Sequence, residues 1–250
     1  MSAFQDEYGM SEYTMIPKTI HYCWFGRGEK PKLAQKCIAS WKKFCPDYEI
    51  VEWNEDNYDV NGTAYTRHCY ENKKWAYLSD YVRLDIVYQH GGVYFDTDVE
   101  VISSLDWLLN NEAFVALEDA QTVATGLGFG AIKGNKYIKA MMGQYDFARQ
   151  EDVFVTGCPD LNTNAIQQFG IHLDGSLQKK DGLLILPVEY MNPYDDPTGR
   201  LTITDKTVSI HWYSKSALSK KSVLRSNLTR PVHRIFGVDC FKWLKRKRES

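Results

Sequence analysis

At 250 residues, 44% of them hydrophobic, and with a formal net charge of −2, the chain can build one large core, and nothing in it requires a second domain. It holds no run of about 18 apolar residues and begins without the charged and then apolar pattern of a signal peptide, so we expect a cytosolic protein. Its six cysteines are scattered without a CxxC pair, which argues against a zinc cluster or a disulfide framework.

The first part of the chain predicts a strand, a crossover helix and a second strand. Residues 16–25 predict the first strand, residues 31–45 carry apolar side chains at helical spacing, and residues 48–53 predict the next strand. This order is typical of a parallel sheet with right-handed crossovers, so we expect an α/β fold. Residues 54–74 are polar and irregular, and we assign them a connecting role with some helix.

Aromatic side chains stand near the carboxyl end of the first predicted strand. Ligands of open α/β sheets bind outside the carboxyl ends of strands, which places His21, Trp24 and Phe25 near where a nucleotide would lie. Gly26 turns the chain out of the sheet, and an aromatic ring here can stack on a planar base. The alternative is that Trp24 belongs to the core and that His21 is a hydrogen-bonded structural residue.

The stretch 75–102, WAYLSDYVRLDIVYQHGGVYFDTDVEVI, organises the rest of the chain. Its apolar residues recur every three to four positions and predict a helix over 80–90. Ser79 is the expected N-cap, and Gly91 is the expected left-handed residue at the C-terminal end. Residues 93–95 then predict a short buried strand, because they are β-branched or aromatic.

Two carboxylates, Asp96 and Asp98, follow this strand. Residues two apart on an extended chain point to the same side, so we expect both carboxylates to enter one space. They repel each other unless a cation or a proton lies between them, and Mg²⁺ or Mn²⁺ suits a site made of carboxylates, water and diphosphate. Asp80 and Arg83 share a face of the preceding helix, where a guanidinium suits phosphate and a carboxylate suits sugar or ribose hydroxyls.

Further elements follow the two carboxylates. We expect a short helical link over 106–109, a strand over 113–117 and an amphipathic helix over 135–149. The segment 126–134, GLGFGAIKG, lacks the GK[ST] ending of a phosphate loop, so it predicts a strand whose glycines let the backbone approach a ligand closely.

The last third of the globular part continues this pattern. A turn at 156–159 precedes a predicted helix over 160–169, and residues 183–188 predict a strand. Residues 190–199 are expected to form a surface loop. Residues 208–213 predict a strand that carries His211; a lone histidine of this kind is more often a satisfied core residue than a metal ligand.

The C-terminal segment 219–250 differs from the rest in charge. It holds ten Lys and Arg residues against two acids, a balance of +8, while the rest of the chain holds 20 basic residues against 30 acids. Aromatic residues are interleaved with the basic ones, a mixture that fits an anionic membrane surface. A solvated C-terminus and a nucleic-acid site are the alternatives, and the acidic body makes nucleic acid the poorer partner.

Three segments carry a resemblance to a known family. They are IPKTIHYCWFG at 16–26, LSDYVRLDIVYQHGGVYFDTDVE at 78–100 and, more weakly, SIHWYSKS at 209–216. On these segments the chain resembles the DXD-motif glycosyltransferases of glycosyltransferase family 32, which includes bacterial capsule and surface-polysaccharide enzymes, and more distantly the clostridial glucosylating toxins. It departs from the family where Cys158 interrupts a Thr-Gly-Pro turn and where Ser216-Ala217 replaces a Ser-Trp pair.

The resemblance implies a nucleotide-sugar donor, a divalent metal, the GT-A type of α/β fold and transfer with retention of anomeric configuration. By the same resemblance, Trp24 matches a position that stacks on the donor base, and His211 matches the late residue that completes the metal site with Asp96 and Asp98. The predicted donor-binding residues are His21, Trp24, Phe25, Gly26, Asp80, Arg83, Asn162 and Ser216.

We therefore predict a retaining hexosyltransferase with Mn²⁺ or Mg²⁺ as cofactor, whose catalytic residues are Asp80, Arg83, Asp96 and Asp98. UDP-galactose or another UDP-hexose is the expected donor, and a lipid-linked glycan of surface or capsule polysaccharide synthesis is the expected acceptor. Residues 1–218 are expected to form the catalytic GT-A domain. Residues 219–250 are expected to hold the enzyme at the inner face of the cell membrane, with no nucleic acid as a partner.

Three other interpretations fit parts of the motif. VYFDTDVEV resembles the strand and paired aspartates of haloacid-dehalogenase-type phosphatases, but Val99 follows the second aspartate where that family has a small residue. A calcium loop requires glycine where this chain has Val101, which argues against an EF-hand. A non-catalytic module that binds nucleotide sugars is the third alternative, and the intact pair of aspartates argues against it.

Overall fold

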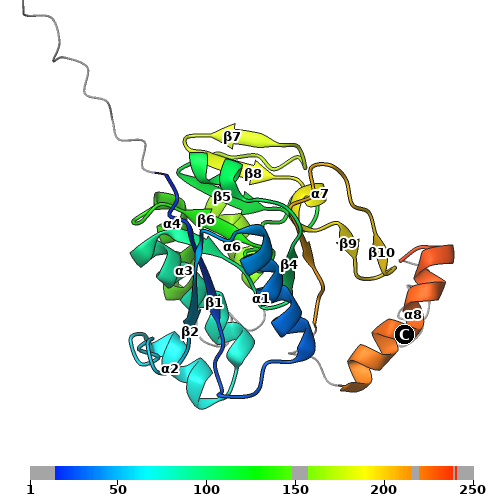
Figure 1. The fold of residues 1–250 in the computed structure, drawn as a ribbon, viewed down its shortest axis with the longest axis horizontal. Helices are drawn as coiled ribbons and strands as arrows, with labels where there is room; N and C mark the ends of the chain where they lie inside the picture. The colour runs from blue at the N-terminus through cyan, green and yellow to red at the C-terminus, as the bar shows by residue number, and fades with distance from the viewer. Residues whose placement is uncertain (1–14, 148–156, 215–219, 239, 241–250) are drawn as a thin grey trace, which may run out of the picture.

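The structure is a computed structural model that describes residues 15–147, 157–214, 220–238 and 240. One sheet of seven strands forms its centre, in the order β2-β1-β3-β6-β5-β8-β7 (Figure 1). The strands are β1 (Thr19–Cys23), β2 (Glu49–Trp53), β3 (Gly92–Tyr94), β5 (Ala113–Ala116), β6 (Phe129–Ala131), β7 (Gln178–Lys180) and β8 (Leu183–Leu186).

Most strands of this sheet run in the same direction. β1 pairs in parallel with β2 and β3, and β5 pairs in parallel with β8. β6 lies antiparallel between β3 and β5, and β7 is antiparallel to β8, so only β6 and β7 run in the opposite direction. The predicted α/β class with a mainly parallel central sheet is therefore confirmed.

Helices cover both faces of the sheet, except for the last one, which lies away from it (Figure 1). They are α1 (Lys32–Phe44), α2 (Ala64–Glu71), α3 (Trp75–His90), the 3₁₀ helix η1 (Asp106–Asn110), α4 (Lys136–Phe147), α6 (Cys158–Gln167), α7 (Val188–Met191) and α8 (Lys220–Phe236). Successive strand side chains point to opposite faces and so feed two hydrophobic clusters. Val115 and Ile185 pack into the cluster of α3, α4 and α6, whereas their neighbours Phe114 and Leu184 belong to the cluster of α1 and η1.

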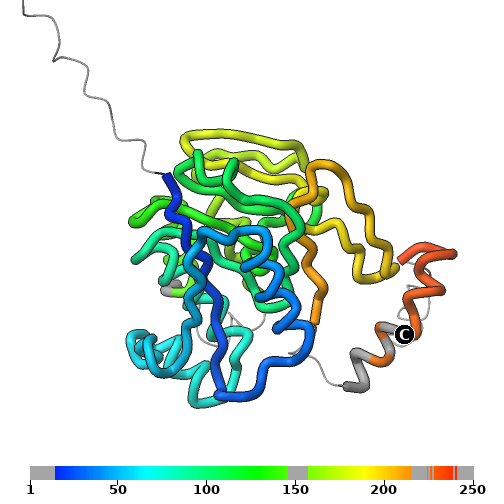
Figure 2. Tube along the Cα trace, in the orientation of Figure 1, coloured from blue at the N-terminus to red at the C-terminus, as the bar shows by residue number. Residues whose placement is uncertain are grey.

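Two small antiparallel pairs extend from this body. β4 (Val99–Val101) pairs with β11 (Ser209–His211), and β9 (Tyr194–Asp195) pairs with β10 (Arg200–Leu201). Figure 2 shows α8 beside the β9–β10 hairpin, where Arg230 donates to the Asp196 carbonyl and Arg234 to the Thr198 carbonyl. Among the helices that the structure describes, none combines the length and the apolar character needed to span a bilayer.

Several predicted boundaries differ from the observed ones. α3 begins at Trp75 rather than after Ser79, whose hydroxyl donates to the Ala76 carbonyl inside the helix and caps nothing. The predicted end is correct, because Gly91 stops the helix at a φ of +71°. The stretch predicted as a surface loop, 190–199, contains the end of α7 and the strand β9. In the C-terminal segment, residues 220–236 form the helix α8.

Helix α1 fixes the position of β4 and hence of the turn before it. The fully buried Trp41 indole donates from Nε1 to the Val99 carbonyl over 2.8 Å. The Ser40 hydroxyl accepts from the Val101 amide over 2.9 Å. Because β4 is only three residues long, these two side-chain bonds from α1 satisfy much of the backbone hydrogen bonding on the edge of β4 that does not face β11.

Gly92 of β3 occupies a conformation and a space that only glycine fits. Its φ is +106°, and a Cβ would lie 2.8 Å from His21 Nε2 and 2.9 Å from the Thr19 carbonyl oxygen. Gly134 also has a positive φ, +73°, but a Cβ there would meet nothing within 4 Å. Alanine substitutions at Gly134 and Gly92 therefore distinguish two effects: backbone strain alone at Gly134, and strain together with steric overlap at Gly92.

We expect Gly134→Ala to cost about 1 kcal/mol of the free energy of unfolding, the strain of a left-handed alanine. We expect Gly92→Ala to cost roughly 2–5 kcal/mol, because overpacking adds to the same strain. Urea unfolding followed by circular dichroism measures both variants. Equal losses in the two variants would contradict the steric part of this explanation.

Candidate active site

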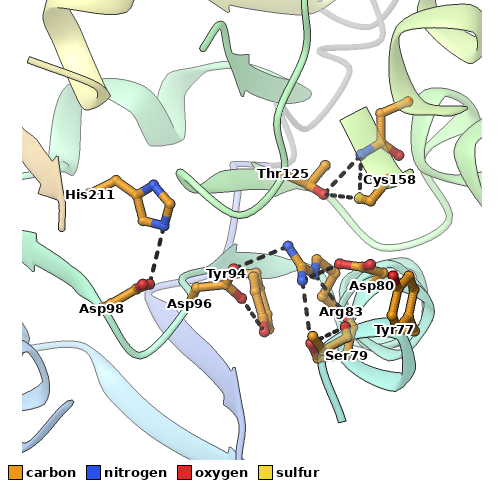
Figure 3. Close-up of polar contacts among 12 residues, drawn as sticks. Tyr77, Ser79, Asp80, Arg83, Tyr94, Asp96, Asp98, Thr125, Cys158 and His211 are labelled. Carbon is orange, nitrogen blue, oxygen red and sulfur yellow. Dashed lines mark hydrogen bonds and ion pairs between the residues drawn. The ribbon is translucent and has the colours of Figure 1, made fainter. Parts of the chain in front are cut away.

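Asp96 and Asp98 lie on a turn between β3 and β4, at the carboxyl end of β3. The Val99 amide donates to the Asp96 carbonyl over 3.0 Å and closes the turn. The expectation that an extended chain places both carboxylates on one side is therefore wrong in its geometry. The expected result still holds, because the turn brings the two carboxylates to the same place (Figure 3).

His211 reaches this turn through the small sheet. In the β4–β11 ladder His211 is paired with Val99, the residue after Asp98. Its Nε2 atom lies 3.2 Å from Asp98 Oδ1. One ligand atom from each of Asp96, Asp98 and His211 lies within 4.8 Å of the others, and these three residues form the acidic cluster of the site.

The electrostatics of the acidic cluster are set by its burial and its neighbours. Burial alone would raise the pKa of Asp98, but the hydrogen bond and charge of His211 and the Ser214 amide, at 2.7 Å, hold the pKa well below its usual range. Burial alone would lower the pKa of His211, and the hydrogen bond and charge of Asp98 outweigh this and raise it. Asp96 has a raised pKa because burial outweighs the attraction of Arg83.

The acidic cluster fits a divalent cation. Two carboxylates and an imidazole are ligands that Mn²⁺ accepts, and a bound cation would remove the cost of holding two buried carboxylates together. The buried Nδ1 atom of His211 has no hydrogen-bond partner among the described residues, so the tautomer is not fixed from that side. Nε2 faces Asp98 and is the atom available for a metal.

Arg83 is the buried cation that joins α3 to the acidic cluster. Only 4% of it is exposed, and its Nη2 lies 2.6 Å from Asp80 Oδ1 while its Nη1 lies 3.4 Å from Asp96 Oδ2. Its guanidinium carbon lies 5.2 Å from the centre of the Tyr94 ring, whose hydroxyl donates to Asp96. Burial raises the pKa of Asp80 to about 6, although Arg83 opposes the shift. Asp80, Arg83 and Asp96 thus form one continuous polar row, as predicted for all three.

The glycine-spaced segment approaches this row closely. A Cβ at Gly126 would lie 2.7 Å from Asp96 Oδ2 and 3.3 Å from Arg83 Nη1. The sequence predicted a close approach of this backbone to a ligand, and the structure shows its approach to the carboxylate and the guanidinium of the site. Gly126 was not assigned to the site from the sequence, and the glycine spacing of segment 126–134 was the one feature that indicated it.

A second polar group lies on the Asp80 side of Arg83. Asn162, fully buried on α6, donates from Nδ2 to Thr125 Oγ1 over 2.9 Å and to Cys158 Sγ over 3.1 Å. Its Oδ1 atom has no hydrogen-bond partner among the described residues. Neither Thr125 nor Cys158 was identified from the sequence as a residue of this group. The one indication was that Cys158 interrupts the Thr-Gly-Pro turn of the family. Asn162 stays a predicted donor-binding residue.

The four residues predicted at the end of β1 have different surroundings. His21 is buried, with Nε2 at 2.9 Å from the Gly91 carbonyl and Nδ1 accepting from Trp53, and burial lowers its pKa to about 4. These contacts are those of a structural residue. Trp24 is half-buried and donates to the Gly28 carbonyl, while Phe25 is buried.

Gly26 has a φ of +88°, and a Cβ there would lie 2.8 Å from the Trp75 indole. Its amide donates to Glu55 Oε1 over 2.7 Å. Ser216 lies outside the described residues. The donor contacts assigned to His21, Trp24, Phe25, Gly26 and Ser216 stay predictions.

Comparison with known proteins gives a match to one family. Residues 31–115 match the family described as glycosyltransferase sugar-binding region containing DXD motif. Inositol phosphoceramide mannosyltransferase 3 of Schizosaccharomyces pombe is 27% identical over 143 residues, which cover 54% of this chain. The matched part is 38% of that relative, so this chain spans well under half the length of the curated relative it matches.

Several solved glycosyltransferases are similar at lower identity. The PaToxG glycosyltransferase is 19% identical with a TM-score of 0.49, covering 62% of this chain and 70% of its own. A glycosyltransferase involved in glycosylation of the major capsid of PBCV-1 is 12% identical with a TM-score of 0.46, covering 84% and 98%. The galactosyltransferase LgtC, solved with donor and acceptor sugar analogues, is 14% identical with a TM-score of 0.41, covering 85% and 95%.

The matched segment 31–115 includes α3, Arg83 and both aspartates of the turn. The match agrees with the resemblance found in the sequence: residues 31–115 are similar to the DXD-containing sugar-binding region of glycosyltransferases.

Proposed function

We propose that the chain is a metal-dependent, retaining glycosyltransferase that moves a hexose from a UDP-hexose to a glycan acceptor. The observation that carries the proposal is the convergence of Asp96, Asp98 and His211 beside the ion pair of buried Arg83 and partly buried Asp80, at the carboxyl edge of the sheet. Open α/β sheets bind nucleotides at this edge. The family match to the DXD region supports the same assignment.

Asp96, Asp98 and His211 would hold Mn²⁺ or Mg²⁺. A cation bound there supplies positive charge to the diphosphate, whose negative charge grows as the sugar leaves. The low pKa of Asp98 keeps this carboxylate ionised throughout the neutral range. The turn between β3 and β4, held by α1, keeps both carboxylates in place before a donor arrives.

Arg83 adds a second positive charge next to the acidic cluster. Its guanidinium is shared between Asp80 and Asp96, so its orientation is fixed by two carboxylates. We propose that one of its edges meets the donor diphosphate and that Asp80 accepts a hydrogen bond from a sugar or ribose hydroxyl. Since Asp80 has a pKa of about 6, its accepting form dominates at neutral pH.

For retention we propose attack on the same face from which the diphosphate leaves. The bond from the anomeric carbon to the phosphate oxygen breaks, the bond to the acceptor oxygen forms, and the acceptor proton passes to the leaving phosphate. A covalent route would need a carboxylate other than the two aspartates of the turn, because both of these are already bound. Asp96 is bound by Arg83 and Tyr94, and Asp98 is bound by His211 and the Ser214 amide.

The donor base is proposed to stack on Trp24, which is half-buried at the end of β1. Gly26 and Phe25 would shape this end of the site, with His21 below them. Asn162 would approach the sugar from α6. Ser216, which lies outside the described residues, is kept as a proposed donor-binding residue. The base is not fixed by stacking, so GDP-mannose belongs in any test, as the name of the mannosyltransferase relative also suggests.

We further propose that α8 holds the protein at an anionic membrane surface, where a lipid-linked acceptor would lie. Leu224, Leu228 and Ile235 are 60%, 68% and 73% exposed and share one side of this helix. Arg230 binds Asp196 at 2.5 Å, and Arg234 donates to the Thr198 carbonyl, so a different side of α8 faces the β9–β10 hairpin. The +8 balance of residues 219–250 complements anionic lipid.

Purified protein should hydrolyse one member of a panel of UDP-hexoses, UDP-N-acetylhexosamines and GDP-mannose in the presence of Mn²⁺. Asp98→Asn should lower the affinity for Mn²⁺ and the hydrolysis rate, each by at least about 100-fold, because the amide cannot replace an ionised ligand. Electron paramagnetic resonance of free Mn²⁺ measures the affinity, and release of the nucleotide measures the rate.

Asp205→Asn, at an exposed position outside the site, is the matched control and should behave as the unmutated protein. Full turnover by Asp98→Asn would refute the proposed metal site. Binding of UDP and Mn²⁺ without turnover of any donor would replace the transferase with a binding module. Release of phosphate from a simple phosphoester would favour the phosphatase alternative.

The membrane proposal has its own test, sedimentation with vesicles of phosphatidylglycerol and phosphatidylcholine. Leu224→Ser with Leu228→Ser should weaken vesicle binding at least tenfold, because each buried leucine contributes about 1.5–3 kcal/mol. Leu177→Ser, at a 51% exposed leucine before β7, is the matched control. Equal binding by all three proteins, or no binding by the unmutated protein, would contradict the role of α8.

A further inference from the structure

A cavity of about 740 Å³ lies beside the acidic cluster, on the His211 side. It is bounded by the residues after β5, by α7 and by the β9–β10 hairpin; Glu118, Asn192, Tyr194, Asp195 and Tyr213 are among its lining residues. Its volume lies within the range of about 300–1,000 Å³ that binds small molecules in proteins. None of the residues assigned above to the donor or the cation lines it.

The cavity adjoins the acidic cluster through Tyr213, and hydrogen bonds link Tyr213 to the residues after β5. The ring of Tyr213 lies 4.1 Å from the ring of His211, measured between centroids. The Tyr213 hydroxyl donates to Asn192 Oδ1 over 3.0 Å, and Asn192 Nδ2 donates to the Glu118 carbonyl over 3.1 Å.

The cavity and the row of Asp80 and Arg83 lie on different sides of Asp96. Figure 3 shows His211 and Asp98 on one side of Asp96 and Arg83 with Asp80 on the other. A donor whose diphosphate meets Arg83 would therefore leave the His211 side open to a second substrate. The reacting carbon would lie between the two sides, next to the acidic cluster.

The chemistry of the cavity wall favours a neutral, hydroxyl-rich ligand. Five acids line it, and among the described lining residues none is Lys, Arg or His. Glu189 is paired with Lys206, and Asp196 is paired with Arg230, which leaves Glu118, Asp119 and Asp195 without a cationic partner among the described residues. Carboxylates only accept hydrogen bonds, so they suit hydroxyl donors and repel anions.

Two features make Glu118 the central polar group of this wall. No hydrogen bond or ion pair to its carboxylate is formed by the described residues, although the side chain is partly buried. Tyr213 and Tyr194 supply aromatic surface in the same cavity, against which the apolar face of a sugar ring can pack. An aromatic wall with an unsatisfied carboxylate is a built site for a sugar that offers both an apolar face and hydroxyls.

We propose that this cavity is the acceptor subsite and that it takes an uncharged sugar, one hydroxyl of which donates to Glu118. The proposal rests on the transferase function argued above. It identifies the acceptor class: a neutral glycan end rather than a uronic acid, a sialic acid or a phosphorylated sugar. Glu118 acts as a positioning residue that aims the acceptor at the reacting carbon.

The experiment measures acceptor binding and transfer separately. Octyl glucoside, galactoside, mannoside and N-acetylglucosaminide are titrated below their micelle-forming concentrations into the protein with UDP and Mn²⁺, with octyl glucuronide as the anionic probe. We expect at least one neutral glycoside to bind at least tenfold more tightly than the glucuronide. Binding of the glucuronide as tightly as any neutral probe, or binding of none, overturns the subsite.

Glu118→Gln then tests the positioning role with the donor found in the hydrolysis panel. It should raise the KM for the neutral glycoside roughly five- to tenfold, because the amide oxygen accepts a neutral hydrogen bond in place of a charge-assisted one. It should also lower the ratio of transfer to hydrolysis by a similar factor. Glu71→Gln, at an exposed position on α2, is the matched control. A KM for the glycoside and a transfer ratio equal to those of Glu71→Gln would overturn the role of Glu118.

The two proposals fail in different ways. Glycoside binding without turnover of any donor leaves the subsite in place and refutes the transferase. Donor hydrolysis without preference for neutral glycosides leaves the transferase in place and refutes the subsite. Circular dichroism and the urea midpoint of Glu118→Gln separate a loss of fold from a loss of acceptor binding.

Discussion

The contact between Asp98 and His211 is the constraint on which the site depends. It joins the turn after β3, in the first half of the chain, to β11, close to the C-terminal helix. The Ser214 amide binds the same carboxylate, so the segment after β11 is tied to the turn twice. Each of β4 and β11 has only three residues and would be marginal alone. The acidic cluster therefore stabilises the small sheet that forms it, and α1 holds that sheet from its other side through Trp41.

Arg83 shows how the site tolerates buried charge. A buried guanidinium is costly unless its donors are satisfied, and this one bonds to Asp80, Asp96 and the Ser79 carbonyl. The charges alternate from Asp80 through Arg83 to Asp96, but Asp98 comes next and repeats the negative charge. A cation bound by Asp96 and Asp98 would restore the alternation, and the donor diphosphate would then continue it. Gly126 allows the alternation to be this compact, because any side chain there would collide with Asp96.

The sequence predicted the parts of this arrangement that local patterns determine. The β1-α1-β2 unit, the end of α3 at Gly91 and the pair of aspartates after β3 follow from periodicity, a glycine stop and motif spacing. The start of α3 was misplaced because Ser79 has the composition of a cap but lies inside the helix. Thr125, Cys158 and Gly126 could not be identified, because their places depend on β6 entering the sheet antiparallel between β3 and β5. His211 was assigned only through the family resemblance, since its partner Asp98 lies far away in the sequence.

Helix α8 contacts residues that line the proposed acceptor cavity, which links the two proposals about substrates and location. Asp196, in the wall of the cavity, is the residue that Arg230 of α8 binds. The Arg230 guanidinium carbon also lies 5.7 Å from the centre of the Tyr194 ring, another part of that wall. A helix held at a lipid surface would therefore place the cavity close to that surface. An acceptor with a neutral sugar end and a lipid chain would then occupy the cavity and the lipid surface together. Its sugar would lie next to His211, and its chain would lie beside the apolar side of α8.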